Sequence, residues 1–173
     1  MIDNTESMRP HRNEVVDVVS LLSYLLKDTD DDGLDICFTQ STESRNSGRA
    51  TKLSETVEKV AFKGISDMRT RLSQILGKYE DKFGTTTASS RSWYKRLGSP
   101  EPQKPLSFYV LTDGKWDPNE VGPIIMSLVD SMREFKLHKD HVGIQFIRFG
   151  QDPNGIARLN QLDHGLGLKK IDM

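Results

Sequence analysis

The chain has little of several features that would place it in a class at once. Its 173 residues include one cysteine, Cys37, and no run of 18 apolar residues. A single cysteine cannot form an internal disulfide, which suits a reducing compartment, and the lack of a long apolar run argues against a membrane-spanning helix. The sequence also does not open with a basic segment and an apolar stretch, so we expect a cytoplasmic protein without a signal peptide.

Neither sign of charge is in excess. The 24 Lys and Arg residues nearly balance the 25 Asp and Glu residues, and the net charge is -1. A chain without a basic excess is a poor match for a nucleic-acid backbone or an anionic membrane surface, so we expect neither as a partner. Glycine-rich phosphate loops are also lacking, which argues against nucleotide binding.

What the sequence does contain is an alternation of helical and strand-like patterns. Apolar residues recur at helical spacing in several stretches, and short apolar runs stand between them. The length and the 35% hydrophobic content fit a single domain spanning 1–173. Threonine and serine dominate 84–105, which predicts a long surface loop. The patterns predict helices at 13–27, 53–60, 68–79, 119–135 and 152–162, and strands at 34–39, 106–111 and 142–149; 40–52 is predicted as a loop that hides a short edge strand.

This order of elements predicts the fold class. Strands separated by helices pair in parallel through right-handed crossovers, which gives an α/β fold with a doubly wound, mostly parallel sheet and helices on both faces. Ligands of such sheets bind where strands end, at their carboxyl edge. We therefore looked for polar side chains just after the predicted strands.

Hard oxygen ligands stand at such positions. Asp3 is followed by the hydroxyls of Thr5 and Ser7, Asp113 follows the predicted strand 106–111, and Ser66 lies in a turn before a predicted helix. Carboxylates and hydroxyls of this kind suit Mg²⁺, which keeps several of its waters when bound to protein. If these residues meet in space, they form a divalent-cation site.

Taken in order, Asp3-x-Thr5-x-Ser7, Ser66 and Asp113 resemble the metal-ion-dependent adhesion site of von Willebrand factor type A domains. The resemblance runs from about residue 2 to residue 162. It implies that Thr5 and Ser7 bind Mg²⁺ (or Mn²⁺) directly, that Ser66 stands where the family has threonine, and that Asp3 and Asp113 act directly or through water.

The same resemblance implies a function. With few carboxylates around it, the cation takes one more anionic oxygen from outside, and an Asp or Glu of a partner protein supplies it. This chemistry requires no nucleophile and no general base. We therefore expect a non-enzymatic module that binds a protein partner through the metal.

Three features depart from the family pattern. Glu6 stands where the family usually has glycine; it would fill the open coordination position if it pointed inward, and we expect it to point outward. The first strand is shortened to Met1-Ile2, and the chain ends at Asp172-Met173. We expect a version of the domain that is truncated at both ends.

Two other functions remain open from the sequence. A degenerate scaffold of the same fold, without metal, is favoured by Glu6 and the short first strand. A metal-dependent phosphatase would use Asp3 as the nucleophile, but Thr5 stands where such enzymes have a second Asp, and a hydroxyl is a poor general acid near neutral pH.

Overall fold

The structure, a computed structural model, describes residues 1–26, 33–83, 104–117 and 121–165. The chain forms two compact units. Unit 1 comprises Met1–Met68, Tyr109–Trp116 and Phe146–Met173, and unit 2 comprises Arg69–Phe108 and Asp117–Gln145. The single domain expected from the sequence stays a prediction. The surface loop predicted at 84–105 lies outside the described residues except for its last two positions.

Helices and strands follow the predicted order closely. The strand β2, in the stretch predicted as a loop with a hidden edge strand, is formed, and α2 begins three residues before its predicted start. Unit 1 contains the 3₁₀ helix η1 (Glu6–His11), α1 (Arg12–Leu26), β1 (Leu34–Cys37), β2 (Ser44–Ser47), α2 (Ala50–Lys59) and α6 (Pro153–Gly165). Unit 2 contains most of α3 (Met68–Glu80), α5 (Val121–Glu134) and η3 (Lys139–His141), and both units share β3 (Leu106–Thr112) and β4 (Val142–Arg148).

The first residues of the chain lie between two strands of unit 1. Ile2 forms parallel bridges with Phe38, directly after β1, and with Leu111 of β3. The Ile2 N–H donates to the Cys37 carbonyl at 2.8 Å, and the Asp3 N–H donates to the Leu111 carbonyl at 2.9 Å. The short first strand therefore has a hydrogen-bonded neighbour on each side.

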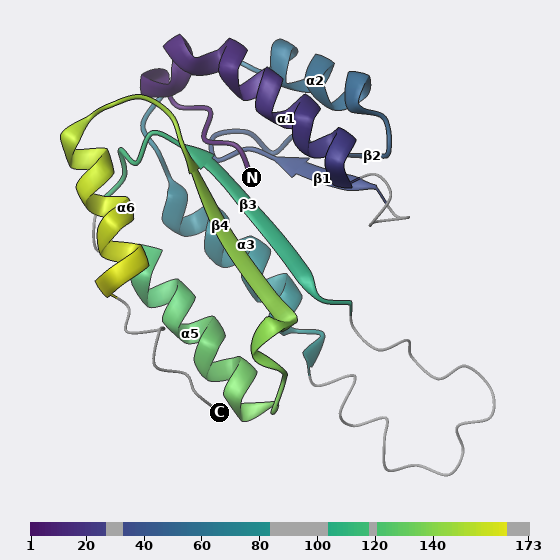
Figure 1. Cartoon of the computed structure of the whole chain (residues 1–173), viewed down its shortest axis with the longest axis vertical. Helices are drawn as coiled ribbons and strands as arrows, with labels where there is room; N and C mark the ends of the chain where they lie inside the picture. The colour runs from purple at the N-terminus through teal and green to yellow at the C-terminus, as the bar shows by residue number, and fades with distance from the viewer. Residues whose placement is uncertain (27–32, 84–103, 118–120, 166–173) are drawn as a thin grey trace. The chain divides into compact units, whose positions relative to one another are not determined.

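Longer strands continue the pairing outward. Strand β2 pairs with β1 in antiparallel register, and β3 pairs with β4. Strands β3 and β4 lie side by side and run in the same direction (Figure 1). The order across the strands is thus β2, β1, the N-terminal residues, β3 and β4.

Helices α1 and α2 pack against each other and close the core of unit 1 (Figure 1). Each places apolar side chains four residues apart on its inner face, which is the spacing of one side of a helix. Arg12 of α1 connects the two helices, because its guanidinium donates to the carbonyl of Val60, just beyond the end of α2, at 3.0 Å. The buried core residues are Ile2, Met8, Val15, Val19, Ile36, Phe38, Leu53, Val57, Val60, Phe62, Leu111 and Phe149.

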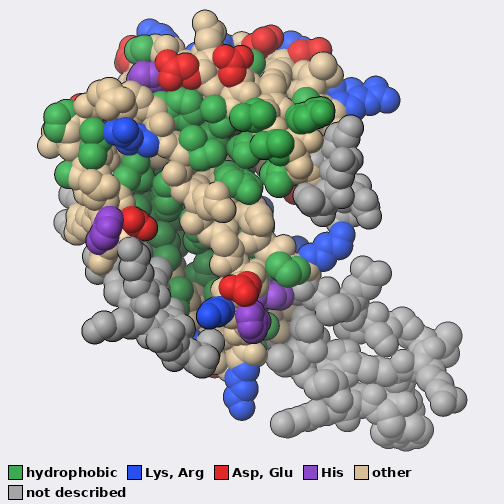
Figure 2. All heavy atoms as spheres, in the orientation of Figure 1, with side chains coloured by type: hydrophobic (Ala, Val, Ile, Leu, Met, Phe, Trp, Pro, Cys, Tyr) green, Lys and Arg blue, Asp and Glu red, His purple; other side chains and the backbone are tan. Residues whose placement is uncertain are grey.

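The surface of unit 1 is mixed in character. Charged side chains crowd the outer side of α1 and α2, and apolar side chains show along α1 (Figure 2). The large apolar residues that are most exposed in the described chain are Leu21, Tyr24 and Leu25 of α1, and Ile65, which is 87% exposed in the loop before α3.

Unit 2 has an apolar core of its own. Helix α5 buries one face, and Phe83 stacks edge-on against Tyr79 with ring centroids 5.4 Å apart. Burial raises the pKa of the Tyr79 phenol to about 12. The buried apolar side chains among the described residues of this unit are Leu72, Leu76, Phe83, Phe108, Val121, Ile125, Leu128 and Met132.

The protein is thus of mixed α/β class with small sheets that include a parallel pair. No helix in the described part of the chain is long and apolar enough to cross a membrane.

Candidate metal centre

Three loops of unit 1 carry the predicted ligands, and backbone hydrogen bonds hold two of them together. The Glu6 N–H donates to the Gly64 carbonyl at 3.1 Å, and the Lys63 N–H donates to the Asn4 carbonyl at 2.9 Å. The third loop follows β3, the parallel neighbour of Ile2. Because parallel strands end at the same edge, the loops after Ile2 and after β3 open on the same side.

Asp3 is fully buried and well supplied with hydrogen-bond donors. Its Oδ2 accepts from the Thr112 hydroxyl at 2.9 Å, and its Oδ1 accepts from the Thr39 hydroxyl at 3.2 Å and from the Thr5 N–H at 3.3 Å. Loss of water on burial nevertheless raises the pKa of Asp3, and the nearby charge of Asp113 adds to this rise. Burial and the neighbouring charge therefore favour the neutral form of Asp3, and a cation beside it would favour the charged form.

The hydroxyl groups of Thr5 and Ser7 lie close to each other in the segment after Asp3. Thr5 Oγ1 and Ser7 Oγ lie 3.2 Å apart and share a hydrogen bond. Thr5 is extended and directly precedes η1, and Ser7 is the second residue of that 3₁₀ helix. Glu6, between them, points outward as expected, since its side chain is 68% exposed and pairs with Arg9 at 3.4 Å.

Asp113 is the second buried carboxylate and is only partly satisfied. It is 3% exposed, and its Oδ1 accepts from the Lys115 N–H at 3.1 Å. Its buried Oδ2 has no hydrogen-bond partner within the described residues. A buried acceptor without a donor is costly, so this oxygen is where an added cation would gain most.

Ser66 is a second unsatisfied group in this part of the molecule. Its Oγ is buried and makes no hydrogen bond to any described residue. The hydrogen bond at Gly64 ties its loop to that of Asp3. The structure thus joins Asp3, Thr5 and Ser7 by hydrogen bonds and brings Asp113 close enough to Asp3 for their like charges to repel. It joins the Ser66 loop to the first loop only through the backbone at Gly64 and Lys63, and no described contact connects the Ser66 hydroxyl to the other predicted ligands.

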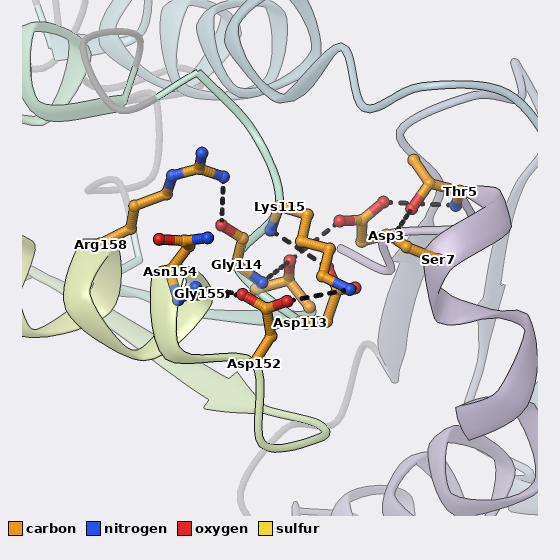
Figure 3. Close-up of polar contacts among 11 residues, drawn as sticks. Asp3, Thr5, Ser7, Asp113, Gly114, Lys115, Asp152, Asn154, Gly155 and Arg158 are labelled. Carbon is orange, nitrogen blue, oxygen red and sulfur yellow. Dashed lines mark hydrogen bonds and ion pairs between the residues drawn. The ribbon is translucent and has the colours of Figure 1, made fainter.

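Lys115 and the start of α6 complete the surroundings (Figure 3). The Lys115 ammonium lies 3.7 Å from Asp113 Oδ2 and 3.4 Å from Asp152 Oδ2. Asp152 caps α6 by accepting from the N–H groups of Gly155 and Asn154, at 3.1 and 2.9 Å. These bonds, with Lys115, lower the pKa of Asp152.

Sequence reasoning missed four residues of this site. Thr112 is the last residue of β3, Thr39 lies two residues after the end of β1, and both donate to Asp3. A hydroxyl at or just after the end of an apolar strand was the available signal. Lys115 and Asp152 carried no local signal, because 37 positions separate the two partners of this ion pair along the chain.

Chemically, the site is a set of oxygens with two buried carboxylates. No three His, Cys, Asp or Glu side chains of the described ranges are grouped to hold a metal ion. The predicted ligand set contains only two residues of these types and relies on hydroxyls for the rest. Such a set fits a hard cation that keeps several waters, and the unbonded oxygens of Asp113 and Ser66 are compatible with ligand positions.

Comparison with known proteins adds no relative. No protein-family model matches the chain, and neither the curated proteins nor the solved structures gave a significant match.

Proposed function

We propose that the protein is a non-enzymatic binding module of the von Willebrand A type, which holds Mg²⁺ (or Mn²⁺) with Asp3, Thr5, Ser7, Ser66 and Asp113. The ion bridges to an Asp or Glu of a protein partner. The observation that carries this proposal is the buried Asp113 oxygen without a hydrogen-bond donor, next to the desolvated carboxylate of Asp3. A divalent cation would stabilise both groups at once.

The strand order supports a doubly wound sheet as the frame of this site. Parallel neighbours on both sides of Ile2 place the N-terminal residues between β1 and β3. This is the arrangement at the switch point of a doubly wound sheet, where strand order reverses and ligands bind. Asp3 directly follows that point.

The surroundings of Asp3 favour binding over catalysis. A nucleophilic carboxylate must reach the phosphorus atom of a substrate, but Asp3 is fully buried and both of its oxygens accept hydrogen bonds. Thr5 offers a hydroxyl where a phosphatase of this type needs an acid. We therefore rank the phosphatase last.

Calorimetric titration with MgCl₂ and with MnCl₂ tests the proposal. The wild-type protein should give saturable heat with either ion, and Asp113→Ala should give none while its circular dichroism spectrum is unchanged. Asp163→Ala is the matched control, because Asp163 is 68% exposed on α6 and should leave binding intact. Absence of saturable heat in the wild type, or unchanged binding by Asp113→Ala, would contradict the proposal.

A degenerate, metal-free scaffold is the second candidate, and the position of Lys115 favours it. The ammonium 3.7 Å from Asp113 Oδ2 already supplies a positive charge, and Thr5 and Ser7 already bond to each other. A scaffold of this kind would bind its partner equally well with and without a chelator. The metal-dependent module would lose its partner when EDTA is added.

A further inference from the structure

The Lys115 side chain lies between two carboxylates of unit 1. It directly follows the loop glycine after Asp113, and its ammonium lies within 4 Å of two carboxylates from different segments, Asp113 and Asp152. Figure 3 shows its side chain extending between them. The Asp113 oxygen that it approaches, Oδ2, is the buried one that no donor satisfies.

We propose that Lys115 is a tethered counter-ion that neutralises Asp113 in the metal-free protein and competes with the divalent cation for this carboxylate. The inference rests on the proposed function and adds a control of metal affinity to it. At 3.7 Å the ammonium is too far for a good hydrogen bond but close enough for strong charge attraction. The contact is therefore one that a metal ion can replace.

Asp152 can keep the ammonium in an ion pair after a metal ion has displaced it from Asp113. Its carboxylate is held at the start of α6 by two backbone N–H groups, and its distance to the Lys115 ammonium, 3.4 Å, is shorter than that of Asp113. Lys115 can release Asp113 and keep Asp152 by a small movement of its 43% exposed side chain. Displacement of the ammonium then needs a movement of the side chain alone.

Competition predicts that removal of the ammonium strengthens metal binding. In calorimetric titrations with MgCl₂, Lys115→Met should bind about tenfold more tightly than the wild type, because the cation no longer displaces a positive charge at close range. The gain should shrink at high salt, since part of the side chain is exposed to solvent. Lys115→Arg keeps the charge and should bind like the wild type.

Lys59→Met is the matched control for the loss of one positive charge. Lys59 is 76% exposed on α2 and pairs with Glu55, so its removal changes the net charge equally without touching the site. Its Mg²⁺ affinity should stay within about twofold of the wild type. A second readout is the melting temperature in EDTA, which should fall for Lys115→Met and not for Lys59→Met.

The outcomes separate this inference from the proposed function. Equal Mg²⁺ affinity of Lys115→Met, Lys59→Met and wild type would overturn the inference and leave the proposed function standing. Binding by Lys115→Met alone would support the inference but contradict the proposed function of the wild type, whose ammonium would then keep the site free of metal. If neither the wild type nor Lys115→Met binds Mg²⁺ or Mn²⁺, both ideas are wrong.

Discussion

Several polar side chains at the candidate site are buried although some of their oxygen atoms accept no hydrogen bond from any described residue. Asp113 Oδ2 and Ser66 Oγ are buried without a hydrogen-bond partner among the described residues, and Asp3 is desolvated although three groups donate to it. Burial of polar groups that lack hydrogen-bond donors lowers the stability of the fold unless a bound ligand interacts with them. We infer that a bound cation would remove this cost and that the free energy recovered would contribute to its affinity.

Asp3 gives a prediction about pH in the presence of EDTA. Its folded-state pKa lies above the ordinary value of 3.8, so between these two values the folded protein binds more protons than the unfolded chain. The free energy of unfolding therefore falls as pH rises through this window. Relative to Asp3→Asn, the wild type should lose stability across it, and thermal unfolding over a pH series measures the difference.

Added Mg²⁺ should stabilise the wild type and not Asp3→Asn. A bound cation favours the charged carboxylate, so at neutral pH added MgCl₂ should raise the melting temperature of the wild type and leave that of Asp3→Asn unchanged. A wild type whose stability relative to Asp3→Asn rises with pH in EDTA would contradict the assigned direction of the shift.

At the scale of elements, close contact between the loop after β3 and the start of α6 positions Asp113. Gly114 has a φ of +80°, and a Cβ on it would lie 2.7 Å from the Cα of Gly155. A Cβ on Gly155 would collide with the carbonyl oxygen of Asp113. Arg158 adds a hydrogen bond from α6 to the Gly114 carbonyl at 3.0 Å. The loop and helix can therefore pack this closely only with two glycines.

Gly155→Ala should destabilise the protein by about 1–3 kcal/mol, because the backbone must move to admit the methyl group. Gly77→Ala is the control, since Gly77 lies within α3 and a Cβ there meets no atom within 4 Å. It should be neutral or stabilise the helix by up to about 1 kcal/mol. Urea unfolding measures both, and equal stability of the two variants would count against the close packing.

The short first strand is the second element with a testable role. Ile2 is 1% exposed and pairs on both sides, whereas Ile65 is 87% exposed. Ile2→Ala should cost about 2–5 kcal/mol, because it leaves a cavity at the centre of the core. Ile65→Ala should stay within about 0.5 kcal/mol of the wild type. Chemical denaturation of the two variants compares the same substitution in both places.

Across the whole molecule, periodicity predicted the elements well and tertiary contacts poorly. Helical spacing located α1, α3 and α5 to within a few residues, because the apolar face of each packs on a core. The partners of Asp3 were only partly predictable, since Thr39 and Thr112 reach it through strand pairing. Two compact units, with β3 and β4 shared between them, have no signature in local composition.

Paramagnetic broadening by Mn²⁺ tests the central claim most directly. In ¹⁵N-labelled protein, substoichiometric MnCl₂ should broaden the amide signals of residues 3–7, 64–67 and 112–115, and excess MgCl₂ should restore them. Asp113→Ala serves as the reference, and the same amide signals should keep their intensity in that variant. Broadening that spares the three loops, or that MgCl₂ does not reverse, would contradict a metal centre built from Asp3, Thr5, Ser7, Ser66 and Asp113.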